Sequence, residues 1–221
     1  SRGLGDVYKR QLVEGADYNI TWPSDLINAG KKEITVTGRG GYVGTKKLTY
    51  EIIPAAIAGV SLSAVRYTYD GSAKKPAVIV KSNGKTLSAD TDYTVSWPSD
   101  VIGVGKKTVT VTGKGNYMGT RTGAFEIVFA SIDNVSLSAT HYTYDGSAKN
   151  PAVIVKCGGR ALVEGIDYTV TWPSDVTNVG EKEVTVTGKG NYAGKLKASY
   201  EIVAAPKPEP VSYTHLTLPT I

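Results

Sequence analysis

Hydrophobic and polar residues alternate along several short segments of the chain. In KTVTVTG (107–113), Val109 and Val111 fall on one side and the threonines on the other, and KKEITVTG (31–38) and EKEVTVTG (181–188) repeat the pattern. Alternation of β-branched with polar residues is typical of half-buried antiparallel strands, whereas an amphipathic helix would space its hydrophobic residues three or four positions apart. These segments therefore predict strands.

The segment DYTVSW (92–97) alternates in the same way, with Tyr93, Val95 and Trp97 on one face. The sequences VSLS, YTY, AVIV and FEIV supply further short strands, separated by stretches rich in glycine, asparagine, aspartate and proline. Those residues favour turns because they tolerate positive φ or preset the backbone for a turn. Short strands at this spacing, without a segment of helical periodicity, predict an all-β fold of tandem immunoglobulin-like antiparallel β-sandwiches.

The whole pattern recurs at a spacing of 75 residues, so the chain is built from repeats. The recurring segments are TWPSD (21–25), SWPSD (96–100) and TWPSD (171–175), and GRGGY (38–42), GKGNY (113–117) and GKGNY (188–192). The sequences YTYDGSAK and PAVIVK occur only in the second and third repeats, because Leu12 corresponds to Leu87 and Leu162 in mid-repeat. We expect the C-terminal part of one repeat at 12–56, complete repeats at 57–131 and 132–204, and a proline-rich linker at 205–210.

The two ends of the chain differ from the repeats. One short DNA sequence and its reverse complement can encode DVYKRQ (6–11) and VSYTHL (211–216), and both ends resemble translated transposon-end adaptors of sequencing libraries. We treat residues 1–11 and 211–221 as adaptor-like artefacts and exclude them from the functional argument. On this hypothesis the repeats are a fragment of a longer protein, and the first repeat is truncated.

The set YTYDGSAKKPAVIVK, DYTVSW, GKKTVTVTGKGNYMGT and FEIV resembles the Ig-like tandem repeats of secreted and cell-surface proteins, chiefly of Gram-positive bacteria. The resemblance covers nearly all of residues 12–204. It implies a stalk or spacer beside adhesive or enzymatic domains, located outside the cell or at the bacterial cell surface. The Trp-Pro-Ser-Asp segment departs from the usual form, in which a tyrosine followed by serine and asparagine is more common.

Charge and cysteine content narrow the choice of partners. The chain has 25 basic and 20 acidic residues, which become 22 and 19 without the adaptor-like ends, a net charge of +3. The basic residues are dispersed, so we expect no nucleic-acid partner. The single cysteine, Cys157, excludes an intrachain disulfide. No hydrophobic run reaches the length of a membrane helix, so we expect no membrane insertion within the fragment.

The sequence lacks a set of residues for catalysis, so we expect neither enzyme activity nor a cofactor. Of the two histidines, His215 lies in an adaptor-like end, and His141 corresponds to Arg66 in the preceding repeat. Cys157 corresponds to Ser82 in a turn, and a nucleophilic cysteine needs a partner base. The glycine-rich GKGNY segments lie between strands, whereas phosphate-binding loops precede a helix, so we interpret them as a turn with a bulge.

Two further kinds of chemistry stay open, although we expect no metal site. Asp90 and Asp92, or Glu164 and Asp167, could join Asp100 or Asp175 around calcium, but the acidic residues lack the density of a dedicated calcium loop. A lysine and Asn191 could form an isopeptide cross-link promoted by Glu201, as in some surface Ig-like domains.

The favoured interpretation of Trp-Pro-Ser-Asp is a strand end that runs into a turn. Trp97 has the same parity as Tyr93 and Val95, so it faces the core if they do. Pro98 cannot donate a hydrogen bond to a sheet and holds the preceding residue in an extended conformation. The serine and aspartate that follow are turn residues that hydrogen-bond nearby backbone amides.

The alternative interpretation is a ligand-binding site. Trp97 and Trp172 would stack on sugar rings, and Asp100 and Asp175 would accept hydrogen bonds from sugar hydroxyls. Sites repeated in tandem would gain avidity without high affinity at any one of them.

We therefore expect a non-catalytic spacer or stalk segment of a larger bacterial extracellular protein, with the neighbouring domains of that protein as its partners. The alternative is an adhesin module that binds extracellular glycans or host surface proteins through its tryptophans. In either case residues 12–54 lack several strands of the repeat, and we expect an open sheet edge and an incomplete core there.

Overall fold

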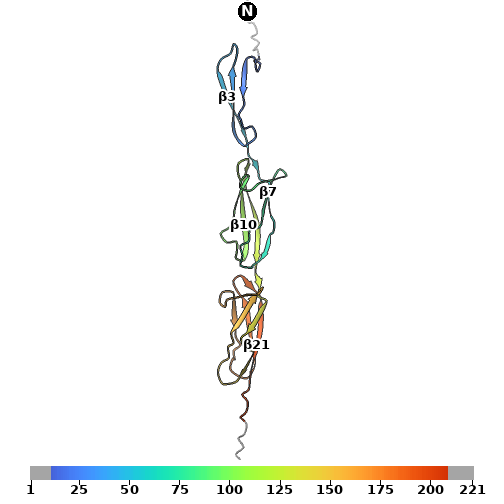
Figure 1. Ribbon diagram of the computed structural model, residues 1–221, viewed down its shortest axis with the longest axis vertical. Helices are drawn as coiled ribbons and strands as arrows, with labels where there is room; N and C mark the ends of the chain where they lie inside the picture. Colours follow the sequence, from blue (N-terminus) through green and yellow to red (C-terminus); the bar gives the residue numbers. More distant parts are fainter. Residues whose placement is uncertain (1–10, 209–221) are drawn as a thin grey trace, which may run out of the picture. The chain divides into compact units, whose positions relative to one another are not determined.

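The computed structural model describes residues 11–208, and its secondary structure consists of strands and turns without a helix in that range. This confirms the all-β prediction. Figure 1 shows the strands following one another along the chain. The adaptor-like segments lie outside the described residues, apart from Gln11. In the part that the structure describes, no helix is long and apolar enough to cross a membrane.

The first segment forms a single antiparallel sheet of three strands in the order β1-β2-β3. Its strands are β1 (Tyr18–Thr21), β2 (Gly30–Gly38) and β3 (Thr45–Ile52). As predicted, β2 and its counterparts in the later repeats arise from the Thr-Val-Thr alternation. Within residues 11–208 this segment forms one sheet and not a sandwich, and the truncation of the first repeat stays a prediction.

The middle of the chain forms a three-stranded sheet, β5-β7-β8, and a four-stranded sheet, β6-β12-β10-β9. The strands are β4 (Ala55–Ala56), β5 (Gly59–Leu62), β6 (Arg66–Thr68), β7 (Val78–Ser82), β8 (Lys85–Thr86), β9 (Tyr93–Ser96), β10 (Gly105–Gly113), β11 (Tyr117–Met118) and β12 (Thr120–Val128).

The last part repeats this arrangement as the sheets β14-β16-β17 and β15-β21-β19-β18. The strands are β13 (Ala130–Ser131), β14 (Asn134–Leu137), β15 (His141–Thr143), β16 (Val153–Cys157), β17 (Arg160–Ala161), β18 (Tyr168–Thr171), β19 (Gly180–Gly188), β20 (Tyr192–Ala193) and β21 (Lys195–Val203).

The core of each complete repeat lies between its two sheets. In the middle part, Val80 on β7 and Val111 on β10 belong to one buried cluster. In the last part, Val155 on β16 and Val186 on β19 do the same. All four are at most 1% exposed, which confirms the two-sheet sandwich.

The first sheet lacks such a core. Ile34 and Val36 are only half-buried, whereas their counterparts Val109 and Val111 are completely buried. Leu48, which pairs with Ile34 across the sheet, is 50% exposed. The incomplete core expected for residues 12–54 is therefore present.

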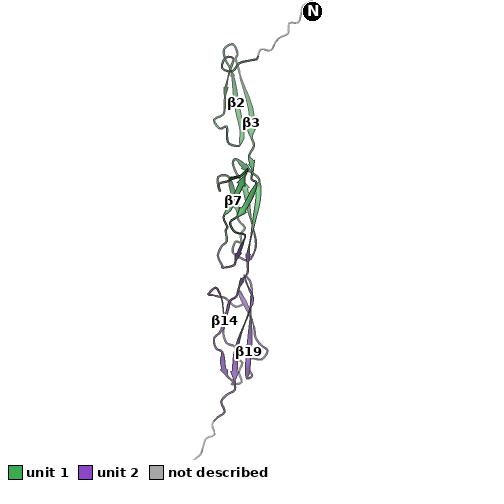
Figure 2. Ribbon diagram, turned by 90° about the vertical axis from the view of Figure 1, so that its right-hand side faces the viewer, with its two compact units in different colours: residues 1–65, 74–101, 106–126 green, residues 66–73, 102–105, 127–221 purple. Residues whose placement is uncertain are grey.

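By its internal contacts, the chain divides into two compact units, coloured separately in Figure 2. The first unit comprises residues 1–65, 74–101 and 106–126, and the second comprises 66–73, 102–105 and 127–221. These units are not the repeats of the sequence, whose boundaries stay a prediction. Each unit contains segments that lie far apart along the chain.

Not every strand pair is antiparallel. β15 pairs with β21 in parallel, and so do the two-residue pairs β4–β11 and β13–β20. Parallel strands cannot be joined by a tight hairpin, and each of these pairs joins segments that are distant in sequence. The antiparallel prediction is correct for the long strands, which neighbour one another along the chain.

The Gly-Lys-Gly-Asn-Tyr segments are turns, as predicted. Gly190 has φ = +66°, a conformation that other residues rarely adopt. A Cβ atom at Gly188 would lie 2.8 Å from the backbone of Ala193. The first glycine of this turn is therefore needed for close backbone approach and the second for positive φ. The same holds for Gly113 and Gly115.

Candidate functional site

The three Trp-Pro-Ser-Asp segments begin immediately after strands β1, β9 and β18. Each tryptophan is therefore the first residue beyond its strand. The burial of Tyr93 and the half-burial of Val95, with exposed residues between them, follow the predicted alternation. The segments are strand ends that lead into turns.

None of the three tryptophans is fully buried, and they differ in their contacts with the core. Trp97 is half-buried and meets Phe125 edge-on, with 6.4 Å between the ring centroids, and Lys75 Nζ lies 6.0 Å from its ring. Trp172 is also half-buried and packs against the cluster that contains Tyr200. Trp22, on the open first sheet, is 54% exposed.

Each aspartate of these segments forms an ion pair with a buried lysine of the next long strand. The lysine side chains are 8–9% exposed. The pairs are Lys32 Nζ–Asp25 Oδ2 at 2.8 Å, Lys107 Nζ–Asp100 Oδ2 at 2.6 Å and Lys182 Nζ–Asp175 Oδ2 at 2.7 Å. The carboxylate compensates a positive charge that the sheet holds away from water.

The other carboxylate oxygen closes the turn. Asp175 Oδ1 accepts hydrogen bonds from the backbone N–H groups of Thr177 at 2.9 Å and Asn178 at 3.0 Å. The hydrogen bond from Lys182, together with these backbone bonds, holds the pKa of Asp175 well below its usual range. In the first sheet, the backbone hydrogen bond from Asn28 is the largest cause of the same downward shift of the pKa of Asp25.

These contacts bear on the predicted ligand-binding residues Trp97, Asp100, Trp172 and Asp175. Each aspartate already pairs with a lysine, so a sugar hydroxyl would have to share or displace that contact. The indole rings keep part of their surface in solvent. The favoured turn interpretation accounts for every contact described above, and the binding role stays a prediction.

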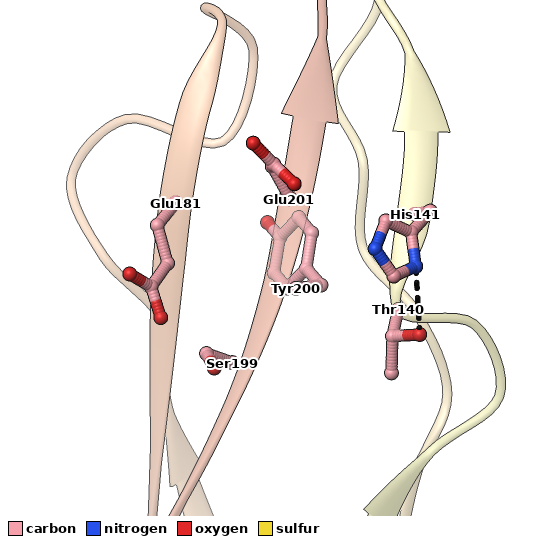
Figure 3. Close-up of a pocket in the computed structure, with 6 residues that line it drawn as sticks. All are labelled: Thr140, His141, Glu181, Ser199, Tyr200 and Glu201. Carbon is pink, nitrogen blue, oxygen red and sulfur yellow. Dashed lines mark hydrogen bonds between the residues drawn. The ribbon is translucent and has the colours of Figure 1, made fainter.

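A shallow polar pocket lies elsewhere, on the outer side of the last sheet. His141, Glu201 and Glu181 come from the neighbouring strands β15, β21 and β19, and Figure 3 shows them around the pocket with Thr140 and Ser199. The nearest partner of the histidine is Thr140, with 3.1 Å between Oγ1 and Nδ1. Among residues 11–208, no three His, Cys, Asp or Glu side chains are placed to hold a metal ion.

Other candidate groups have structural partners. Asp92 Oδ2 accepts from the N–H of Ser88 at 2.9 Å, which places this carboxylate in a turn. Cys157 Sγ lies 3.1 Å from the carbonyl oxygen of Ser131, and burial raises the pKa of its thiol. Asn191 lies in the turn before β20, where its side chain also accepts a hydrogen bond, described next.

Sequence reasoning missed a second recurring site. It lies where β4 or β13, which we call the linker strands, meets the Gly-Lys-Gly-Asn-Tyr turn of the following repeat. In the first unit, Ala55 N donates to Asn116 O at 2.9 Å, and Ile57 N donates to Met118 O at 3.0 Å. In the second unit, Ala130 N donates to Asn191 O at 3.1 Å.

The asparagine side chains of these turns make a further contact. Asn116 Oδ1 accepts from Ala29 N at 2.6 Å, and Asn191 Oδ1 accepts from Val104 N at 3.0 Å. Both bonds join residues 87 positions apart. The recurrence of asparagine at these two positions, with Gly41 in the first repeat, was the available signal.

The MBG domain family model matches residues 58–131, which lie within the predicted second repeat. A search of curated proteins gave no match. Three solved structures show distant similarity. Domains 4–9 of the surface layer protein SbsC are 15% identical with a TM-score of 0.22, over 89% of this chain and 40% of that one. PcdhgB3 EC1-4 is 10% identical with a TM-score of 0.28, over 88% of this chain and 66% of that one. Protocadherin Gamma B7 extracellular cadherin domains 1–4 are 10% identical with a TM-score of 0.24, over 80% of this chain and 58% of that one.

The chain thus spans 40% of the surface-layer structure and no more than 66% of the two others. The family match covers less than half of the chain and concerns the middle repeat. It supports a structural or adhesive module of a surface protein, located outside the cell or on its surface.

Proposed function

We propose that residues 12–204 are a non-catalytic spacer or stalk within a larger extracellular protein of the bacterial cell surface. In this proposal the repeats occupy 12–56, 57–131 and 132–204, and the proline-rich stretch 205–210 is a semi-rigid linker. The partners are the domains that adjoin the repeats in the parent protein.

The observation that carries the proposal is the recurring contact between linker strands and asparagine-containing turns. A flexible connection between domains would leave the backbone N–H groups of its linker to water, whereas Ala55 and Ala130 donate theirs to the next turn. Each complete repeat also has its own buried core, so a repeat can be added or removed as a unit.

A deletion of residues 57–131 tests the spacer function. Joining Ala56 to Ile132 keeps the register, because Ile132 corresponds to Ile57 and both are at most 4% exposed. We expect a folded protein whose maximum dimension in small-angle X-ray scattering falls by about the length of one repeat, and rises by the same step when one repeat is added. A dimension that does not change with repeat number, or loss of the β-sheet circular dichroism, contradicts the proposal.

A second candidate function is glycan or host-protein binding through the tryptophan segments. The observation in its favour is that Trp97 and Trp172 are only half-buried, and each is followed three residues later by an aspartate, Asp100 or Asp175. Lys75, close to the Trp97 ring, adds a cation at that site.

Glycan arrays separate the two functions. An adhesin predicts binding that is lost in the double variant Trp97→Ala/Trp172→Ala and kept in Tyr144→Ala, a change at an exposed aromatic residue outside the segment. Binding that survives the double variant rules out the tryptophan site. A folded chain that binds no glycan or host protein leaves the spacer function as the remaining candidate.

A further inference from the structure

Two loops end against an asparagine side chain from a distant part of the sequence. We call 27–29 and 102–104 the receiving loops, and 113–117 and 188–192 the asparagine turns. In both cases an amide oxygen accepts the N–H of the last residue of the receiving loop, Ala29 or Val104. Each bond lies within one compact unit.

The side-chain bond adds to the backbone bonds of the linker strand at the same turn. Asn191 accepts Val104 N with its side chain and Ala130 N with its backbone oxygen. Asn116 accepts Ala29 N and Ala55 N in the same manner. One asparagine thus holds two segments of the preceding repeat, the receiving loop and the linker strand.

The surroundings of Asn116 and Asn191 differ in their further side-chain contacts. In the first unit, Asn116 Nδ2 donates to Asn28 Oδ1 at 2.7 Å. The position that corresponds to Asn28 is Gly103, which has no side chain to accept such a bond. There, Tyr69 packs edge-on against Tyr192, with 5.4 Å between centroids and 87° between the ring planes.

Tyr69 contributes to the packing of the second unit. It packs against the buried cluster of the last repeat, which includes Tyr192. In the first unit, the asparagine turn at 113–117 borders a pocket of about 330 Å³. Lys85 and Tyr117, the counterparts of Arg160 and Tyr192, line that pocket.

We infer that Asn116 and Asn191 are coupling residues, each of which stabilises the receiving loop of the preceding repeat and so makes that loop depend on the folding of the next repeat. The inference deepens the proposed spacer function, on which it rests, because it names the surface that consecutive repeats share. Gly41 stands at this position in the first repeat and offers no side chain for the same contact.

Amide hydrogen exchange in the full chain tests the inference. We expect Asn191→Ala to accelerate exchange at Val104 by roughly five- to tenfold, the effect of one lost hydrogen bond, and to leave Ala29 unchanged. Asn116→Ala should do the reverse. Asn191→Asp keeps the acceptor oxygen and should restore the protection of Val104.

Asn134→Ala, a change at an exposed residue of β14, is the matched control and should alter neither amide. Unchanged exchange at Val104 in Asn191→Ala overturns the inference, as does equal acceleration at Val104 and Ala29, which would indicate general loosening. The outcome is separate from that of the scattering experiment, since repeats can space domains without this coupling.

Discussion

At the scale of single residues, the Asp–Lys pair is the most regular feature of the repeats. The side chain of Lys182 is 8% exposed, whereas that of Asp175 is 43% exposed. The two partners therefore depend on each other unequally. Without the aspartate, the lysine charge would stay in a poorly hydrated position without compensation, while the aspartate without the lysine would still be solvated and would still close its turn.

The inequality predicts the effects of substitution on stability. Asp175→Ala should lower the Tm by several degrees, and Lys182→Met, which removes the buried charge and keeps most of the volume, should change it much less. Thermal unfolding followed by circular dichroism measures both. A larger loss in Lys182→Met than in Asp175→Ala would show that the ion pair itself, rather than the uncompensated lysine, determines the effect.

The same aspartates make the protein sensitive to acid. The pKa values of Asp25 and Asp175 are lowered in the folded state, so the contribution of these two residues to the free energy of unfolding is complete above the unfolded-state pKa of about 4. It is lost as the pH falls below that value toward the folded-state pKa. We expect the Tm to be flat from pH 7 to 5 and to fall below pH 4, less steeply in Asp175→Asn. An equally steep fall in that variant would assign the acid sensitivity to other groups.

Sequence parity was sufficient to place Trp97 and Trp172 beside the core, because alternation along a strand depends only on the strand itself. It could not supply the lysine partner, since Lys182 and Asp175 are joined across a turn whose path is set by the fold. The constant spacing of seven residues in all three pairs was a signal in the sequence, but such a spacing is not specific to contact.

At the scale of elements, the first sheet shows what a facing sheet contributes to burial. β2 and β10 have nearly the same sequence, yet Val109 is completely buried and Ile34 is not. The difference arises because β10 faces β5, β7 and β8 across the sandwich, while β2 has no facing sheet in the described chain. The burial of a strand's side chains therefore depends on the facing sheet as well as on the sequence of the strand.

The first sheet should open more often than the complete sandwiches. We expect backbone amides of residues 12–54 to exchange about tenfold or more faster than those of 57–204, because few buried apolar contacts oppose local opening. Hydrogen–deuterium exchange with mass spectrometry resolves the two regions. Equal protection would mean that another surface covers the open face in solution, for example a second copy of the chain.

The strand pattern was readable from the sequence, but the linker pairs were not. β10 and β19 follow from alternation over nine residues. β4 and β13 have two residues each, Ala-Ala and Ala-Ser, which carry no periodicity. Their pairing with β11 and β20 depends on the position of the following repeat, which no local pattern encodes.

At the scale of the whole molecule, the stability of the complete repeats should depend little on the first segment. The buried clusters around Val80 and Val155 contain no residue of the first segment. The contacts of that segment with the first asparagine turn are hydrogen bonds at residues 28, 29 and 55. Loss of the segment should therefore cost the remaining repeats little.

A shortened chain that begins at Ile53 tests this independence. We expect its main thermal transition within about 3 °C of that of the full chain, since distant sites contribute nearly independently. Differential scanning calorimetry also shows whether a separate early transition, belonging to residues 12–52, disappears. A fall of the main transition by 10 °C or more would show that the first sheet is part of the same cooperative unit.

The asparagine turn also has a consequence for how such a gene can change in length. Asn116 and Asn191 occupy the same place in successive 75-residue periods, and so do the Ala29 and Val104 amides that they accept. Unequal recombination between two periods therefore creates a new junction between repeats. At that junction the backbone N–H of the receiving loop still meets an asparagine side-chain oxygen. Array length can vary between strains without compensating mutations, except at a period such as the first, where Gly41 replaces the asparagine.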